Sequence, residues 1–98
     1  MSATLTMVDW DGVKPQQYEA LRRLVDWERD SPKGLSFHVA TFDENGGHFL
    51  DLWDTVEEFQ SFIESRLMPG ARKVGIEGNP RAQMKPVQAV FTPGYRPA

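Results

Sequence analysis

The sequence predicts an α+β fold in which four antiparallel strands form one sheet and two helices cover one of its faces. Two observations lead to this prediction. The chain has 98 residues, which is enough for a single domain, 1–98, with one modest core. Segments rich in β-branched and apolar residues alternate with segments of helical periodicity, in the order strand, helix, strand, strand, helix, strand. This order places both helices on the same face of the sheet.

The N-terminal part of the chain is typical of a strand followed by a helix. Residues 3–10, ATLTMVDW, alternate roughly between apolar and polar types, and Asp11-Gly12 is a turn signal that closes the strand. Pro15 suits the first turn of a helix. The residues at helical spacing are Tyr18, Leu21, Leu24 and Val25, with Ala20 and Trp27 on the flank. We expect this helix to end near Ser31-Pro32.

The middle of the chain predicts a β-hairpin. Residues 35–42, LSFHVATF, and residues 48–53, HFLDLW, both favour strands, and the intervening DENGG supplies turn residues. We therefore expect these two strands to pair antiparallel.

A second helix and a last strand complete the order. Asp54 or Thr55 can cap the helix, and Pro69-Gly70 is expected to interrupt it. Its apolar face carries Val56, Phe59, Ile63 and Leu67. The last strand is expected over residues 85–92 and ends at Pro93-Gly94. Together the elements predict the ferredoxin-like βαββαβ arrangement.

Strand alternation sorts the side chains into two faces. One face is purely apolar and is expected to lie against the helices; it holds Leu5, Met7, Leu35, Phe37, Val39, Leu50 and Leu52. The other is aromatic and polar and holds Thr6, Val8, Trp10, Ser36, His38, Phe42, Phe49, Asp51 and Trp53. An uncovered aromatic face would promote aggregation, so we expect a second copy of the sheet to cover it in a homodimer, leaving a cavity in between.

Composition excludes several classes of partner. The net charge of −3, with the eleven Lys and Arg residues dispersed, argues against nucleic acid. The absence of cysteine excludes disulfides and thiolate metal sites and fits a reducing compartment. Because neither a signal peptide nor a membrane-spanning stretch is present, the expected location is the cytoplasm, with no membrane partner.

His38 and Asp51 are the candidates for acid–base chemistry. Both interrupt otherwise apolar strands, and one register of the hairpin places them face to face, whereas a one-residue slip separates them. An imidazole beside a carboxylate can act as a general base, and the pair can equally be a structural hydrogen bond. His48, next to the turn, is expected to face solvent. No metal site is expected, because a third ligand is missing.

The run Leu52-Trp53-Asp54-Thr55, followed by Phe59 and Phe62, resembles the dimeric α/β-barrel superfamily, in particular its antibiotic biosynthesis monooxygenase and haem-degrading monooxygenase branch. The resemblance covers nearly the whole chain and implies fold more strongly than activity. Haem-degrading relatives have an Asn in the first strand and a His near the second helix. Here no Asn precedes Asn45 and no His follows His48, so haem degradation is not expected.

The resemblance implies a cofactor-independent monooxygenase, isomerase or cyclase acting on a planar aromatic or polyketide-like molecule, with no cofactor. In this hypothesis His38 is the base, Asp51 orients it, and a small apolar or aromatic ligand is bound by Trp10, Thr6, Phe42, Phe49 and Trp53. The tryptophans are equally well explained as anchors of the dimer interface. The alternative hypothesis is a non-catalytic dimeric module that binds a ligand or serves a structural role.

Overall fold

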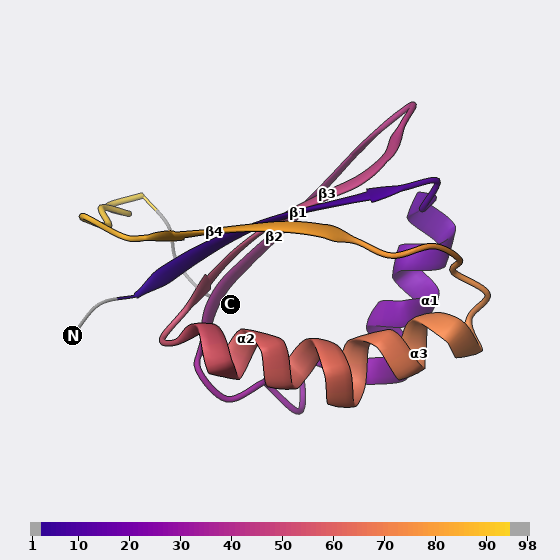
Figure 1. Ribbon diagram of the computed structural model, residues 1–98, viewed down its shortest axis with the longest axis horizontal. Coiled ribbons are helices and arrows are strands. Elements are labelled where there is room, and N and C mark those ends of the chain that lie inside the picture. Colours follow the sequence, from indigo (N-terminus) through magenta and orange to yellow (C-terminus); the bar gives the residue numbers. More distant parts are fainter. Residues whose placement is uncertain (1–2, 95–98) are drawn as a thin grey trace.

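The computed structural model of the chain describes residues 3–94. Its elements are β1 (Thr4–Asp11), α1 (Pro15–Val25), β2 (Leu35–Asp43), β3 (Gly46–Trp53), α2 (Val56–Phe62), the π-helical turn η1 (Ile63–Leu67), α3 (Met68–Lys73) and β4 (Arg81–Pro86). The strands form one antiparallel sheet in the order β2-β3-β1-β4. The helices all lie on one side of this sheet, and no helix of the described residues covers the other side, here called the bare face (Figure 1). The predicted α+β, ferredoxin-like fold is confirmed.

The first helix is shorter than expected. α1 ends at Val25 rather than near Ser31-Pro32, because Asp26 adopts a left-handed conformation with φ 58° and ψ 43°. The backbone N–H of Asp26 then donates to the carbonyl of Arg22 at 3.0 Å, which closes the helix. After this cap the chain turns back and places Trp27 in the core.

The hairpin has a shorter turn than the sequence indicates. The Asp43 carboxylate accepts from the backbone N–H of Asn45 at 2.8 Å and from that of Gly46 at 3.2 Å. These bonds hold the turn, so β3 begins at Gly46 and not at His48.

The prediction that Pro69-Gly70 interrupts the second helix is wrong. The helix begins after Thr55, whose hydroxyl accepts from the backbone N–H of Glu58 at 3.1 Å, and α2, η1 and α3 follow without a break (Figure 1). In η1 the backbone N–H of Met68 donates to the carbonyl of Ile63, which is the wider spacing of a π-helix. Pro69 consequently falls in the first turn of a new α-helical segment, where its missing N–H is tolerated.

The predicted last strand is displaced along the chain. β4 spans Arg81–Pro86 rather than residues 85–92, and it pairs with β1 from Asp9↔Arg81 to Thr4↔Pro86. Beyond it, the backbone N–H of Val87 donates to Ala3, and the apolar residues that follow leave the sheet; Phe91 is 74% exposed. The error arises because an edge strand that is exposed throughout needs no apolar run.

The assignment of the two sheet faces is also wrong, because it is inverted. In the structure the bare face carries the apolar rows Leu5↔Leu52↔Phe37 and Met7↔Leu50↔Val39, which are aliphatic except for Phe37. The helices cover the aromatic face instead, where Trp53 lies 5.8 Å from Phe59 and Tyr18 lies 5.5 Å from Phe49, measured between ring centroids. A bulge between Leu35 and Phe37 separates those two residues, and Leu35 joins the helix-side core. Large rings on both layers fill the space between helices and sheet better than the short aliphatic rows would.

Candidate active site

A chain of hydrogen bonds joins α1, β2 and β3 on the helix side of the sheet. The hairpin register sets His38 directly opposite Asp51. His38 Nδ1 lies 2.5 Å from Asp51 Oδ1, and His38 Nε2 lies 2.7 Å from the hydroxyl of Tyr18. The register that the sequence left open therefore brings the imidazole and the carboxylate together and adds a tyrosine.

Trp53 fixes the direction of these hydrogen bonds. Its indole Nε1–H donates to Asp51 Oδ2 at 3.2 Å, and an indole nitrogen can only donate. An ionised Asp51 then accepts at both oxygens, from Trp53 and from His38 Nδ1–H. Neutral His38 keeps an unprotonated Nε2, which accepts the hydrogen bond from the Tyr18 hydroxyl. The protons are assigned from this network of partners.

The carboxylate end of the network is shielded from water, whereas the side chain of His38 is 22% exposed. Asp51 is 8% exposed and Trp53 is fully buried, at 0%. Burial raises the pKa of Tyr18 to about 12, so its hydroxyl carries its proton at neutral pH.

A small apolar cavity borders the network. Its volume is about 50 Å³, and Tyr18, His38 and Asp51 supply the ionisable groups of its wall. The rest of the wall is apolar and is formed by Val8, Trp10, Val13, Leu21, Trp27, Leu35, Phe49, Phe59, Phe62, Ile63, Leu67 and Ile76. The cavity thus lies between sheet and helices within one copy of the chain, not between two sheets.

The five residues expected to bind a ligand take different positions. Trp10 and Phe49 line the cavity, and the indole of Trp10 donates to the carbonyl of Glu77 at 3.0 Å. Phe42 packs edge-on against the ring of Tyr18, and Trp53 supports Asp51 from outside the cavity. Thr6 is fully buried opposite Asp51, and its hydroxyl has no hydrogen-bond partner within residues 3–94.

Tyr18 is the site residue that sequence reasoning missed. Its spacing marked it only as part of the apolar face of α1. The available signal was its hydroxyl, because a tyrosine on a buried helix face needs a polar partner in the facing layer.

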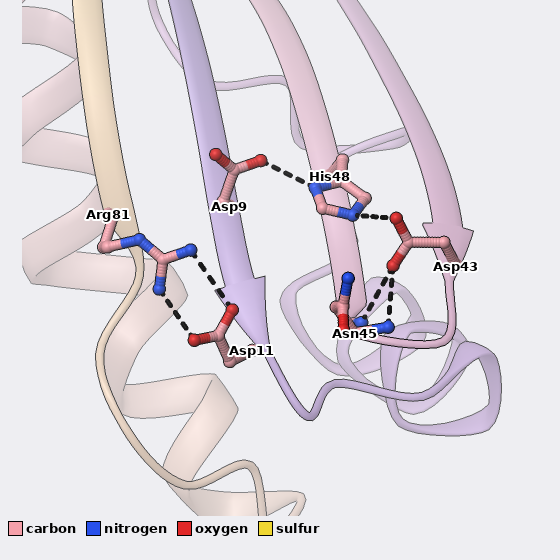
Figure 2. A network of polar contacts seen from close by, with 7 residues as sticks. Asp9, Asp11, Asp43, Asn45, His48 and Arg81 are labelled. Carbon is pink, nitrogen blue, oxygen red and sulfur yellow. Dashed lines mark hydrogen bonds and ion pairs between the residues drawn. The ribbon is translucent and has the colours of Figure 1, made fainter.

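The second histidine belongs to a separate network on the bare face. His48 Nδ1 lies 2.6 Å from Asp9 Oδ1, and His48 Nε2 lies 2.8 Å from Asp43 Oδ2 (Figure 2). The hydrogen bond to Asp9, followed by that to Asp43, raises the pKa of His48. Next to this cluster, Arg81 pairs with Asp11 at 2.8 Å. His48 is therefore a partly covered ion-pair residue at the hairpin, away from the cavity.

The described residues form neither a metal-binding cluster nor a membrane-spanning helix. Within residues 3–94 no group of three or more His, Cys, Asp or Glu side chains is arranged to hold a metal ion. In the same residues no helix has the length and apolar character needed to cross a membrane.

Comparison with known proteins finds solved structures that share this fold. No family model and no curated protein matches the sequence. Among solved structures, the chain is similar to a variant of SnoaB, a cofactor-independent oxygenase from Streptomyces nogalater, with a TM-score of 0.61 and 11% identity over 92% of this chain and 96% of that one. It is also similar to a monooxygenase from the gene ActVA-Orf6 of Streptomyces coelicolor in complex with Nanaomycin D, with a TM-score of 0.59 and 10% identity over 95% and 93% of the two chains.

A third similar structure has no assigned activity. It is a dimeric ferredoxin-like protein of unknown function from Thermobifida fusca, with a TM-score of 0.58 and 12% identity over 88% of this chain and 92% of that one. At these identities the likeness is one of fold. The resemblance to antibiotic biosynthesis monooxygenase-like dimeric α/β barrels is confirmed at that level.

Proposed function

We propose that the protein is a cofactor-independent enzyme, of the monooxygenase type, that acts on a planar aromatic molecule with His38 and Asp51 as its base. One observation carries this proposal: an imidazole held by a buried carboxylate opens onto an apolar cavity. Such a pair can accept a proton, since Asp51 stabilises the imidazolium that results. The oxygenases with the same fold support the reaction type.

The reaction needs a base, an electron-rich substrate and dioxygen. Removal of a proton from an aromatic ketone with an acidic CH₂ group leaves an enolate, which can transfer electrons to dioxygen without a metal or flavin. One oxygen atom of dioxygen becomes the new carbonyl oxygen. The other leaves with the two hydrogens as water, so that CH₂ and O₂ give C=O and H₂O.

The cavity must widen for such a substrate. Its volume of about 50 Å³ is well below the roughly 150 Å³ of an apolar cavity that binds benzene. We therefore expect the substrate to displace side chains of the wall, and tricyclic substrates to bind more slowly than bicyclic ones.

Anthrone, whose oxidation to anthraquinone changes its absorbance, is a suitable probe. We expect the wild-type protein to accelerate this oxidation in air and not under nitrogen. His38→Gln should lower kcat about 100-fold or more, the usual range for loss of a general base. His48→Gln is the matched control, because it removes the other histidine, and it should leave kcat unchanged.

Two results would overturn the enzyme proposal. One is a wild-type rate equal to that of buffer, and the other is full activity of His38→Gln. Bound anthrone without product would favour the non-catalytic module instead.

The bare face supports a homodimer through the sheets, which we include in the proposal. Val39 and Leu50 are 42% and 36% exposed there, and an uncovered aliphatic face of this kind favours association with a second copy. The similar structure from Thermobifida fusca is described as dimeric. The contact expected here differs from the one expected from sequence, because the mainly aliphatic rows around Leu50 and Leu52 would meet, and not the face that carries Trp10, Phe49 and Trp53.

Sedimentation of a charged variant tests the dimer. Leu50→Glu should convert a dimer into a monomer, because each copy would bring a carboxylate into the apolar contact. Leu24→Glu is the control: Leu24 is 49% exposed but lies on α1, so this variant should remain dimeric. A wild-type monomer at micromolar concentration would contradict the assembly and leave the chemistry at His38 unaffected.

A further inference from the structure

We propose that Tyr18 is the catalytic residue that takes the proton from the substrate, and that His38 acts through it. This inference rests on the proposed function and changes which side chain touches the substrate. It follows from the hydrogen bonds that join Tyr18, His38 and Asp51, and from which of their atoms can still accept a further hydrogen bond.

His38 has no free acceptor for a substrate. A neutral imidazole has one N–H and one unprotonated nitrogen with a single in-plane lone pair. The N–H is engaged by Asp51 at 2.5 Å, and the lone pair is engaged by the hydroxyl of Tyr18 at 2.7 Å. A substrate proton can reach His38 directly only if Tyr18 first moves away.

Tyr18, in contrast, retains an acceptor. Its one hydroxyl hydrogen points to His38, and its oxygen keeps lone pairs for a second partner. Tyr18 is part of the cavity wall, and within residues 3–94 its hydroxyl makes no hydrogen bond other than the one to His38. The tyrosine oxygen is therefore the acceptor at which a substrate hydroxyl or enol can dock.

The ring of Tyr18 is held firmly enough to keep this hydroxyl in place. Phe49 stacks on it at 5.5 Å with an interplanar angle of 15°, and Trp27 meets it at 5.7 Å and 53°. Because aromatic contacts surround it, a swing of Tyr18 away from His38 would open voids in the core.

The proton transfer is balanced. The substrate gives a proton, from the acidic CH₂ group of the ketone or from the hydroxyl of its enol tautomer, to the oxygen of Tyr18 as the proton of Tyr18 passes to Nε2 of His38, and Asp51 stabilises the resulting imidazolium; the substrate is left as the enolate. Tyr18 is neutral before and after the step. A concerted transfer of this kind avoids a free tyrosinate, which the pKa of about 12 disfavours.

Anthrone oxidation by Tyr18→Phe, His38→Gln and the double variant tests the inference. We expect kcat of Tyr18→Phe to fall about as far as that of His38→Gln, about 100-fold or more, with KM within about threefold of wild type. The double variant should lose no more than either single variant, because the two side chains act as one unit. Phenylalanine keeps the ring, and thermal melts would verify the fold.

An unchanged or raised kcat of Tyr18→Phe would overturn the inference. If His38 contacts the substrate itself, Tyr18→Phe frees the lone pair of Nε2 and should keep or raise kcat while His38→Gln remains inactive. That result would refute the role of Tyr18 and leave the proposed function standing. Full activity of His38→Gln, or no wild-type turnover, would refute the proposed function and this inference with it.

Discussion

Two histidines of this chain have both ring nitrogens hydrogen-bonded, yet their surroundings give them opposite properties. His38 lies between a hydroxyl and a carboxylate on the helix side of the sheet, with Tyr18 and Asp51 as partners. His48 lies between two carboxylates on the bare face, with Asp9 and Asp43 as partners (Figure 2).

The difference lies in whether a proton can move. Ionised carboxylates can only accept, so Asp9 and Asp43 both favour a His48 ring that donates from its two nitrogens, and these hydrogen bonds raise the pKa of His48. At His38 one partner is a hydroxyl, which can donate as well as accept, so Nε2 can serve as an acceptor and a proton can pass between Tyr18 and the ring. The same side chain is thus an ion-pair residue at one site and a candidate base at the other.

The largest change in the free energy of unfolding is expected from replacing Trp53, which donates a hydrogen bond to Asp51. Trp53→Ala removes a fully buried ring from contact with Phe59 and Phe62 and removes the donor to Asp51. We expect it to lower the free energy of unfolding by about 3–5 kcal/mol in urea denaturation. A loss below about 1 kcal/mol would contradict this expectation and show that neighbouring side chains fill the space left by the indole.

Replacing one carboxylate partner of each histidine should change the free energy of unfolding by different amounts. Asp51→Asn replaces a buried carboxylate, which accepts from both the indole of Trp53 and His38, by a neutral amide that can accept only at its oxygen, and we expect a loss of about 1–3 kcal/mol. Asp43→Asn alters an exposed hydrogen bond to His48 that water can replace, so its effect should be much smaller. Equal losses in thermal or urea unfolding would contradict the distinction.

The smallest effect is a pH dependence that belongs to His48. Because its folded pKa is raised above the ordinary 6.5, its charged form contributes stability that is fully present below about pH 6.5 and is lost as the pH rises through the folded pKa. The melting temperature of the wild type should therefore fall slightly above about pH 6.5, and this decline should be weaker in His48→Gln. Melting curves at several pH values would measure it, and an identical decline in both proteins would exclude His48 as its source.

The sequence was informative about order and pairing. Turn residues around DENGG and the helical spacing after Pro15 predicted the element order. The alternation of side chains along the strands placed His38 and Asp51 on the same face of the predicted sheet. These features depend on neighbours along the chain or directly across a hairpin, which local patterns encode well.

Other features depended on contacts that local patterns do not contain. Alternation shows which residues share a face, but the face that meets the helices is decided by packing against rings such as Phe59, so the assignment was inverted. The Tyr18 contact joins α1 to β2 across the sheet–helix space. The polar edge strand Arg81–Pro86 was missed because it has no buried face to leave an apolar pattern.

The π-helical turn makes two positions of the chain dependent on each other. In a regular α-helix the ring of Pro69 would press on the carbonyl of Ser65, and its missing N–H would leave a backbone acceptor unpaired. The extra residue of Ile63–Leu67 relieves this conflict. A deletion of one residue in this turn should therefore be tolerated only together with replacement of Pro69, so the insertion and the proline are expected to be gained or lost jointly as chains of this kind diverge.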